Sequence, residues 1–448
     1  MKKIYYRLKF VPRSPLRIGN GMHELSDSDL MLDGRGLPFI PGTSLAGIIR
    51  HRAGSICSDK ETLKRLFGNI EKAGEGVEET TNTSSAIIIG DAVIRVRDAG
   101  EEKDVFISNR EGVALGEWET AKKGAKFDFQ ISETDREFYS IVEWTGDEKQ
   151  ETEEISKIIE PILKSYIATG LSAGARTSRG YGKFDLHVTK KDFAFPDKLS
   201  EWIEFKPYDA NAFEEGIELK GTLLEKDCTI KIGFKMKSTF SVRVRTARTE
   251  LMDDGTVPDS VPMTNFKGKP IIPGTAWAGV FRHHMHHLLR DIGVYENSTE
   301  MKSLDRVFGM SDVKGEVFKS LLNFSESVIN IDDEKKQRLS ITRTAVDRFT
   351  ASPRNAALYT NMVYCGGNGE LLIRYDYESL TRQQRELIAA CICDMHTGLL
   401  AVGGQSSVGS GIMEVESVVV NGVDKTTDMT ASIESGASLD WLEVAKNG

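Results

Sequence analysis

The stretch GLPFIPGTSLAGIIRH at residues 36–51 recurs as GKPIIPGTAWAGVFRH at residues 268–283. The offset between the two copies is constant along the whole stretch. A repeat of this kind marks a duplicated structural unit, because similar sequences at a fixed period fold into similar units. The sequence therefore predicts two copies of one module.

The repeat extends on both sides of this stretch. Upstream, LKFVPRSPLRIG at residues 8–19 pairs with FKMKSTFSVRVR at residues 234–245, so that Arg17 is expected to correspond to Arg243. Near the end of each half, a glycine-rich segment recurs. Each module has roughly 200 residues, which is a single-domain size. The expected parts are a first module at residues 1–195, a linker at 196–217, a second module at 218–422 and a polar tail at 423–448.

Changes in hydrophobic period predict the secondary structure of a module. Tyr6, Leu8 and Phe10 alternate with charged residues, as in a strand with one buried face. After the Pro-Gly turn, Thr43 or Ser44 is expected to cap a helix. Further strands, a second helix and a last strand follow. This order predicts an α+β fold with the split βαβ, or ferredoxin-like, plan.

The composition is that of an acidic globular protein. The 448 residues include 58 Lys and Arg against 67 Asp and Glu, which gives a formal net charge of -9. That balance argues against a protein that binds nucleic acid through its net charge alone. No apolar run approaches the roughly 18 residues that can span a bilayer, and residues 1–10 lack the pattern of a signal peptide. We therefore expect a cytoplasmic protein that does not enter the membrane.

Cysteines and histidines give no strong metal signal. The five cysteines contain no CxxC pair, so neither a disulfide framework nor a thiolate zinc site is indicated. The run HHMHH at residues 283–287 has two histidines four apart, but no glutamate completes a zincin motif. Only His283 has a counterpart, His51. We interpret the run as an incidental feature of a helix surface.

Four segments together resemble the RAMP superfamily of CRISPR-associated proteins. They are IPGTSLAGIIRH, the loop GARTSRGYG before a final strand, REGVALGEWETAKKGAKFDF at residues 110–129, and AVDRFTASPRNAALY at residues 345–359. The resemblance implies two tandem RAMP modules, each a modified ferredoxin-like or RRM-like fold. Both are most similar to the backbone subunit of type III CRISPR effector complexes, and their fusion resembles type III-D variants.

The resemblance also implies a function and partners. Backbone subunits of this kind hold guide RNA and cleave the paired target RNA. The implied partners are a CRISPR guide RNA, a single-stranded target RNA and other type III effector subunits. A hairpin called the thumb, which inserts into the guide–target duplex, is implied at residues 110–127 and 343–359.

The glycine-rich loop is a candidate for RNA contact. Closely spaced glycines let backbone N–H groups approach a phosphate, and Arg176 and Arg179 add positive charge. The alternative is a tight turn that only starts the last strand. In the second copy Gln405 and Val408 stand in place of the two arginines, so weaker binding is expected there.

Other arginines form local basic regions within the acidic chain. Neutralising contacts to phosphates release counterions wherever the RNA backbone lies, so such regions suit RNA binding. The alternative is an ordinary solvated surface. The candidates are Arg17, Arg50, Arg110, Arg243, Arg245, Arg282, Arg343, Arg348 and Arg354.

Cleavage is the sharpest implication of the resemblance. It implies an aspartate on the loop before the Pro-Gly element and a divalent cation, Mg²⁺ or Mn²⁺, with products that carry a 2',3'-cyclic phosphate and a 5'-hydroxyl. Asp27 and Asp259 occupy that place in register. An ordinary aspartate is a poor base at neutral pH, so metal binding or orientation of the reacting groups is the favoured role. The longer second loop also offers Asp253 or Asp254.

Two alternatives stay open, and the sequence disfavours a third. Asp27 and Asp259 are also typical turn residues. A subunit that only holds the guide–target duplex would need no aspartate. A metal-independent guide-processing RNase would need a histidine as acid or base, and His23 or His51 is offered for that role without a convincing partner.

Overall fold

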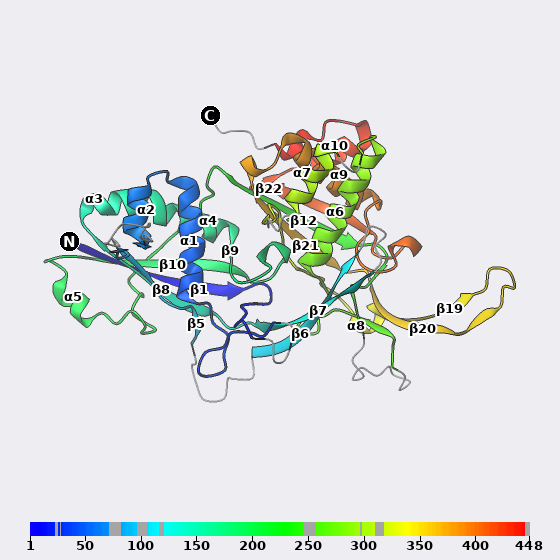
Figure 1. Ribbon diagram of the computed structural model, residues 1–448, viewed down its shortest axis with the longest axis horizontal. Coiled ribbons are helices and arrows are strands. Elements are labelled where there is room, and N and C mark those ends of the chain that lie inside the picture. The colour runs from blue at the N-terminus through cyan, green and yellow to red at the C-terminus, as the bar shows by residue number, and fades with distance from the viewer. Residues whose placement is uncertain are drawn as a thin grey trace, which may run out of the picture. The chain divides into compact units, whose positions relative to one another are not determined.

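The computed structural model describes residues 1–22, 26, 28–70, 82–95, 105–115, 121–245, 257–295, 298–309 and 318–443. The chain is of the α+β class and divides into two compact units (Figure 1). The first consists of Met1–Gly112, Phe127–Thr177 and Tyr181–Glu225, and the second of Val113–Lys126, Ser178–Gly180 and Lys226–Gly448.

The first unit is built on an antiparallel sheet. Its central strand β1 (Lys2–Pro12) pairs with β8 (Phe138–Gly146) on one side and β10 (Lys183–Ala194) on the other. The path of the sheet is β11-β10-β1-β8-β4, which ends at β11 (Ile217–Glu218) and β4 (Ile87–Ile89). Two short strands lie off this path, β5 (Val93–Ile94) on β8 and β9 (Leu171–Ser172) on β10.

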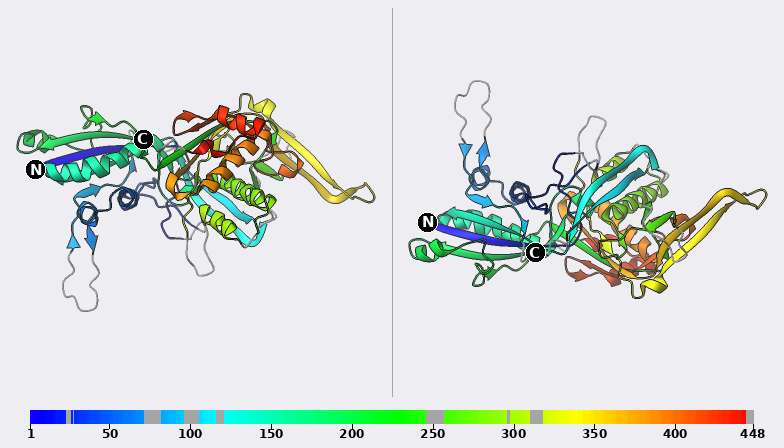
Figure 2. Two further views of the ribbon diagram at one scale, coloured as in Figure 1. Left: turned by 90° about the horizontal axis from the view of Figure 1, so that it is seen from above. Right: turned by 90° about the horizontal axis from the view of Figure 1, so that it is seen from below.

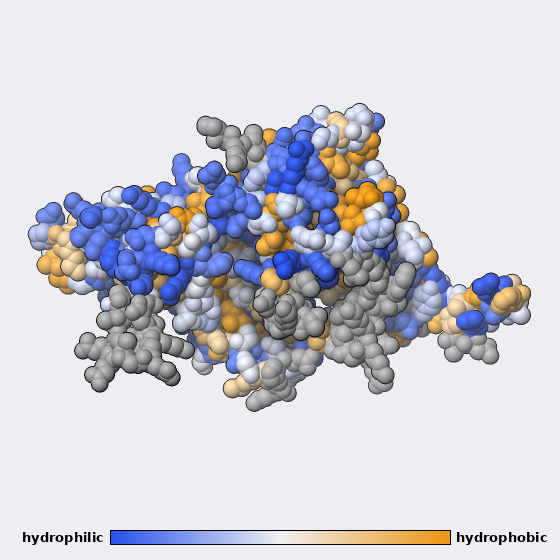
Figure 3. Space-filling model, turned by 45° about the horizontal axis from the view of Figure 1, so that its top comes forward, coloured by the Kyte–Doolittle hydropathy of each residue, from blue (hydrophilic) through white to orange (hydrophobic). Residues whose placement is uncertain are grey.

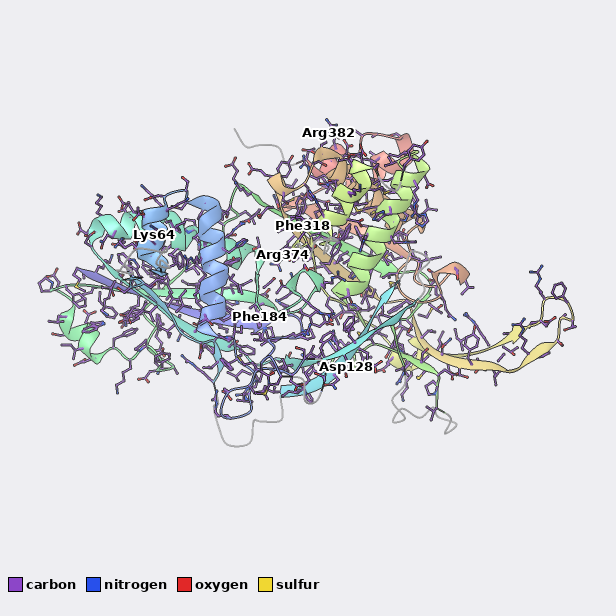
Figure 4. The ribbon with its side chains drawn as sticks, viewed as in Figure 1. Lys64, Asp128, Phe184, Phe318, Arg374 and Arg382 are labelled. Carbon is purple, nitrogen blue, oxygen red and sulfur yellow. The ribbon has the colours of Figure 1, made fainter. Side chains whose placement is uncertain are left out.

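Helices of the first unit bury an apolar face against this sheet. They are α1 (Gly42–Ile56), α2 (Lys60–Phe67) and a segment of α3 (Glu148–Gln150), a π-helix η2 (Glu151–Ile159) and α4 (Glu160–Thr169). In the core, Phe184, which is labelled in Figure 4, meets Phe10 and Phe138 edge-on. Rings at right angles in a dry core are a favourable aromatic arrangement, so the alternating apolar residues of β1 fix this face of the sheet.

Helix α1 starts at Gly42, without a side-chain cap from Thr43 or Ser44. Pro41 holds the N-cap position, and the Gly42 N–H donates to Asp91 Oδ1 at 2.7 Å. A Cβ at Gly42 would lie 2.3 Å from the Ile89 carbonyl oxygen. The expected cap is therefore wrong, because a tertiary contact with the segment after β4 satisfies the helix end.

Residues in the predicted linker cover the opposite face of the first sheet. They include α5 (Leu199–Glu204), and Phe213 is buried together with Tyr5, Ile141 and Phe193 of the strands. The linker is attached by packing as well as by chain connection.

The second unit repeats this order. Its sheet runs β17-β21-β12-β22-β23, with β12 (Asp227–Met236) central between β21 (Asn368–Asp376) and β22 (Met413–Val420). The edges are β17 (Asn323–Phe324) and β23 (Val423–Asp424). Helices α6 (Gly274–Asp291), α7 (Thr299–Val307) and α9 (Arg382–Thr397) lie together over the sheet (Figure 1). Trp277, Phe281 and Met285 of α6 point into the core.

Hairpins and short strands complete both units. The hairpin of β6 (Val105–Leu115) and β7 (Ala121–Thr134) corresponds to that of β19 (Arg338–Val346) and β20 (Pro353–Cys365), which follows α8 (Glu334–Gln337). The second hairpin projects from its unit in Figures 1 and 2. The shorter strands are β2 (Asn69–Ile70), β3 (Asn82–Thr83), β13 (Thr239–Phe240), β14 (Arg243–Arg245), β15 (Ser260–Pro262), β16 (Ile271–Ile272) and β18 (Ser327–Val328).

The segment predicted as a polar tail contains α10 (Thr426–Ser435) and a 3-10 helix, Asp440–Leu442. Met429, Trp441 and Leu442 are buried in the second core. Arg385 donates to both carboxylate oxygens of Glu443, at 2.9 and 3.2 Å. This segment is therefore part of the second unit.

The upstream repeat aligns differently from the expected pairing. The Arg17 carbonyl accepts from the Ala175 N–H at 2.7 Å, and the Ser241 carbonyl accepts from the Gly404 N–H at 2.9 Å in the equivalent place. Ser241, and not Arg243, is the counterpart of Arg17. A slip of two residues leaves the alternation of buried and exposed side chains unchanged, so the hydrophobic pattern could not reveal it.

Within the described residues, none of the helices combines the length and the apolar character that a bilayer crossing requires.

The glycines of the glycine-rich loops are required by close backbone packing. A Cβ at Gly182 would lie 1.8 Å from the Ala173 carbonyl oxygen, and one at Gly411 would lie 2.1 Å from that of Val402. Both glycines also have positive φ, 61° and 80°. The tight-turn role of these loops is thus present in both modules.

We expect Gly182→Ala to destabilise the first unit by about 2 kcal/mol or more, because a Cβ there meets backbone and the left-handed conformation is strained. Gly47→Ala is the control. Gly47 lies in α1 with no atom near its Cβ position, so alanine should stabilise the helix by about 0.5–1 kcal/mol. Thermal unfolding of both variants tests this, and equal midpoints would contradict it.

Candidate functional site

Of the candidate aspartates, the structure describes Asp259. Asp27, Asp253 and Asp254 lie outside the described residues. Next to Asp27, Asp29 is buried and accepts hydrogen bonds from the backbone N–H and the hydroxyl of Ser26, both at 2.9 Å. Asp29 therefore holds the loop together, and its carboxylate is not presented on the surface.

Strand β7 of the hairpin holds the first aspartate loop. The Gln130 side chain accepts from the Leu30 N–H at 3.0 Å, and the Gln130 N–H donates to the Ser28 carbonyl at 3.2 Å. Further along, Leu16 and Ser132 exchange two backbone hydrogen bonds at 2.8 and 2.9 Å. Leu16 precedes position 27 in the chain, and Ser28 and Leu30 follow it, so β7 contacts the aspartate loop on both sides of that position.

Strand β20 holds Asp259 in the second unit. The Asp259 N–H donates to the Thr360 carbonyl at 2.8 Å, and the Thr360 N–H donates to Asp259 Oδ2 at 2.7 Å. The Ser260 hydroxyl donates to Asn361 Oδ1 at 2.6 Å in a buried contact. Asp259 itself is exposed. The result is a carboxylate that is fixed at one oxygen and open to solvent.

A cluster of arginines and aromatic rings lies beside the first aspartate loop. The Arg17 guanidinium stacks over Phe129 at 4.2 Å from the ring centre, and that of Arg176 lies 4.2 Å from Phe127 and 4.7 Å from Phe129. Two of the predicted RNA-binding arginines are thus brought together. Arg176 has a φ of 56°, and Gln405 has the equivalent value of 67°.

Arg110 completes this cluster. It is buried, forms an ion pair with Glu133 at 3.2 Å, and lies 5.6 Å from the ring of Tyr181. The carboxylate balances its charge inside the protein. Arg110 consequently takes part in the packing within the hairpin and presents little charge to solvent.

Burial shapes the electrostatics of Arg17. Desolvation lowers the pKa of its guanidinium. Its Nε is buried and has no hydrogen-bond partner among the described residues. Cation–π stacking contributes about 0.5–2 kcal/mol at such a site, so the ring of Phe129 substitutes for part of the lost hydration. The guanidinium is held in one orientation.

Among the described residues of the second unit, other side chains stand at three positions of this cluster. Ser241 stands for Arg17, Gln405 for Arg176 and Ser410 for Tyr181, and the Ser410 hydroxyl is 3.2 Å from that of Thr239. Uncharged polar side chains therefore stand at the positions of two arginines and one tyrosine. The two modules therefore share a backbone arrangement and differ in the chemistry beside the aspartate loop.

The first helices of the two modules also differ. Arg50 is exposed on α1, whereas Arg282 on α6 donates to Asp305 at 2.7 Å. A hydrogen bond from His286 at 3.1 Å and the charge of Arg282 hold the pKa of Asp305 below its usual value, against the effect of desolvation. Lys64 occupies the position on α2 that corresponds to Asp305 (Figure 4). Asp305 therefore neutralises part of the charge of Arg282. In the first module the equivalent position holds a lysine, which cannot neutralise the charge of Arg50.

The β19–β20 hairpin carries three predicted arginines, of which Arg348 and Arg354 are exposed and Arg343 is half-buried. Arg348 lies at its tip beside Phe349, whose side chain is 85% exposed. Arg354 is 3.8 Å from Asp347, and Arg343 lies on β19 opposite Tyr359. The projecting end shows hydrophobic and hydrophilic surface side by side in Figure 3. Exposed rings and guanidinium groups together can stack on bases and contact phosphates.

The remaining predicted arginines are Arg179, Arg243 and Arg245. The backbone of Arg243 and Arg245 forms β14, and their side chains lie outside the description. Arg179 is exposed, in the part of its loop that groups with the second unit.

Within the described ranges, no group of three or more His, Cys, Asp and Glu side chains is arranged to hold a metal ion.

Sequence reasoning missed the aromatic partners and the hairpin contacts. Phe127, Phe129 and Ile131 alternate along β7, which is a strand signal in the segment KFDFQI. That alternation could have indicated a buried face. Nothing in the sequence indicated that Gln130 or Thr360 holds the aspartate loop, because these contacts join residues about a hundred positions apart.

The comparisons with known proteins yield a family. A model described as RAMPs, the RAMP superfamily, matches residues 9–185 and 253–414, one region in each predicted module. The two regions together cover more than half of the chain. A search of curated proteins finds no match to the chain.

The Asp305 contacts predict a pH dependence of stability. Its pKa is lower in the folded state than in the unfolded state, so its stabilisation is complete above the unfolded pKa of about 3.9 and is lost as the pH falls through the folded pKa. The wild type should therefore exceed Asp305→Asn in stability at pH 5, with a smaller difference at pH 3. Urea unfolding at both pH values measures this, and a constant difference would refute it.

Proposed function

Because this chain belongs to the RAMP superfamily, we propose that it is a CRISPR-associated subunit with two tandem backbone modules of a type III effector complex. It holds guide RNA together with other effector subunits and pairs the guide with a target RNA. The type III-D-like fusion is part of the proposal, and it is supported by the two modules in one chain.

The strand order supports a ferredoxin-like plan for each module. In the first, β10-β1-β8-β4 with α1 and α4 in the connections has the order of a split βαβ fold. The second has β22-β12-β21-β17 with α6 and α9. The two hairpins, inserted before β8 and β21, correspond to the thumb in this proposal.

One observation carries the proposal of two equivalent working sites. In each family region, the residue that follows the candidate aspartate contacts the second strand of the hairpin, through the Ser28 carbonyl in one and the Ser260 hydroxyl in the other. A hairpin that inserts into the guide–target duplex would thereby bring the aspartate loop to the phosphate at the point of insertion. Geometry of this kind favours positional catalysis.

The proposed reaction is cleavage of the target RNA by its own 2'-hydroxyl. The 2'-oxygen forms a bond to the adjacent phosphorus, the bond from phosphorus to the 5'-oxygen breaks, and the proton lost from the 2'-hydroxyl is balanced by one gained on the leaving oxygen. The products carry a 2',3'-cyclic phosphate and a 5'-hydroxyl. Asp259, and Asp27 by register, would orient the attacking hydroxyl.

A divalent cation fits the donor set at Asp259. Mg²⁺ commonly binds through one or two carboxylates and keeps several waters and phosphate oxygens as ligands, and Asp259 is an exposed carboxylate held by the Thr360 N–H. Asp27 and Asp259 would hold Mg²⁺ or Mn²⁺ together with the RNA phosphate. When bound, the ion neutralises charge on that phosphate.

The second candidate function is a subunit that holds the duplex without cutting it. The replacement of the arginine and aromatic cluster by Ser241, Gln405 and Ser410 favours this for the second module alone. The two functions differ in whether the aspartates are needed for cutting.

The aspartates are tested in the reconstituted complex with guide and complementary RNA. Asp27→Ala and Asp259→Ala should each remove one cut, with a loss of about a hundredfold or more, and the double variant should bind target without cutting. Asp209→Ala, at an exposed aspartate of the predicted linker, should cut normally. Unchanged fragments from the double variant would reject catalysis and leave the duplex-holding function.

The hairpin contact is tested at Gln130. Gln130→Ala removes the acceptor for the Leu30 N–H, so cutting at the Asp27 site should slow by about tenfold to a hundredfold with unchanged target affinity. Cutting at the Asp259 site should be normal, which is the internal control. Gln130→Glu keeps an acceptor and should restore the rate. Equal slowing at both sites would indicate general damage instead of lost positioning.

A further inference from the structure

The four histidines of α6 have two different kinds of partner. His284 Nε2 lies 2.6 Å from Asp394 Oδ2, and His286 Nε2 lies 3.1 Å from Asp305 Oδ1. These two imidazoles connect α6 to neighbouring helices through carboxylates. They are therefore used in packing within the second unit.

His283 and His287 face each other one turn apart on α6. Their Nε2 atoms are 2.9 Å apart, and their rings stand at 76° with centres 4.5 Å apart. His287 is exposed and His283 half-buried. Two imidazole nitrogens at this separation either share one proton or chelate one cation.

We propose that His283 and His287 form a binding site for a first-row transition-metal dication, with Cu²⁺ and Ni²⁺ preferred over Zn²⁺. Neutral imidazole nitrogen is a good ligand for all three ions. The site is independent of the RNA-binding function proposed above, because neither histidine has a role in it.

The separation of the nitrogens matches one coordination geometry better than another. With metal–nitrogen bonds of about 2.0–2.1 Å, two nitrogens 2.9 Å apart subtend about 90° at the ion. That is the angle between neighbouring ligands in tetragonal Cu²⁺ or Ni²⁺ sites. A tetrahedral zinc site would need roughly 3.4 Å between the nitrogens.

The protein supplies two ligands to the proposed metal ion, the imidazoles of His283 and His287. No third His, Cys, Asp or Glu completes a metal group among the described residues, so water would fill the other positions. Asp291 follows His287 by four residues at the end of α6 and extends the same helical row. Binding should be weaker than at a four-ligand structural site, and it should not be needed for folding.

The experiment uses the full-length chain without an affinity tag. Titration calorimetry with NiCl₂ should give one site in the wild type. His287→Gln and His283→Gln should each weaken Ni²⁺ binding by at least about tenfold. His51→Gln is the matched control, since His51 occupies the position of His283 on α1 and has Ser55, and not histidine, four residues later. Its binding should equal that of the wild type.

A spectroscopic readout identifies the ligands. Paramagnetic resonance of the protein with one equivalent of Cu²⁺ should show splitting from two equatorial nitrogens, and His287→Gln should lose that pattern while its circular dichroism stays the same. Ni²⁺ binding that is equal in the wild type and both glutamine variants would overturn the proposal. A copper signal with two nitrogens that survives in His287→Gln would overturn it as well.

Discussion

Each module depends on a close backbone approach between its glycine-rich loop and the chain that leaves its first strand. The Ala175 N–H bonds to the Arg17 carbonyl, and the Gly404 N–H bonds to the Ser241 carbonyl, with no room for a side chain at Gly174 or Gly403. A Cβ there would lie 2.3 and 2.6 Å from these carbonyl oxygens. This contact fixes where the aspartate loop begins, and the hairpin strand then packs along that loop. In each module, the sheet, the aspartate loop and the part of the hairpin strand that contacts this loop are consequently held together.

A fixed backbone allows the side chains around it to diverge. In the first module Arg17 and Arg176 both lie over the ring of Phe129, and in the second module serine and glutamine occupy the arginine positions. The hydrogen bonds that hold the glycine-rich loop against the first strand's end join backbone groups. Neither set of side chains is therefore needed to form this contact. The two modules thus share a backbone arrangement, while the charge and the packing beside each aspartate loop differ between them.

The sequence was a good guide to what depends on local pattern and repetition. It predicted the α+β class, the repeated helix after the Pro-Gly turn and the family, which the family match confirms. It failed where distant contacts override local signals. Asp91 satisfies the start of α1 in place of Thr43. The sequence alignment paired Arg17 with Arg243 instead of Ser241. A shift of two residues keeps the alternation of buried and exposed side chains in a strand, so the hydrophobic pattern does not detect it. The roles of Gln130 and Thr360 depend on pairing across about a hundred residues, which periodicity does not encode.

The chain has a net charge of -9, and its arginines differ in whether a carboxylate neutralises them. Arg110 is neutralised by Glu133 in the interior, and Arg282 shares Asp305 with a histidine. Such arginines organise the protein and add little to a field that attracts RNA. Arg348 and Arg354 of the β19–β20 hairpin and Arg50 lie on exposed surface, where their charges act within about 10 Å at moderate salt. The exposed arginines then attract RNA over short segments of the surface, while the acidic residues elsewhere repel it. A chain of this kind is suited to holding RNA along a defined path and is poorly suited to binding it at random.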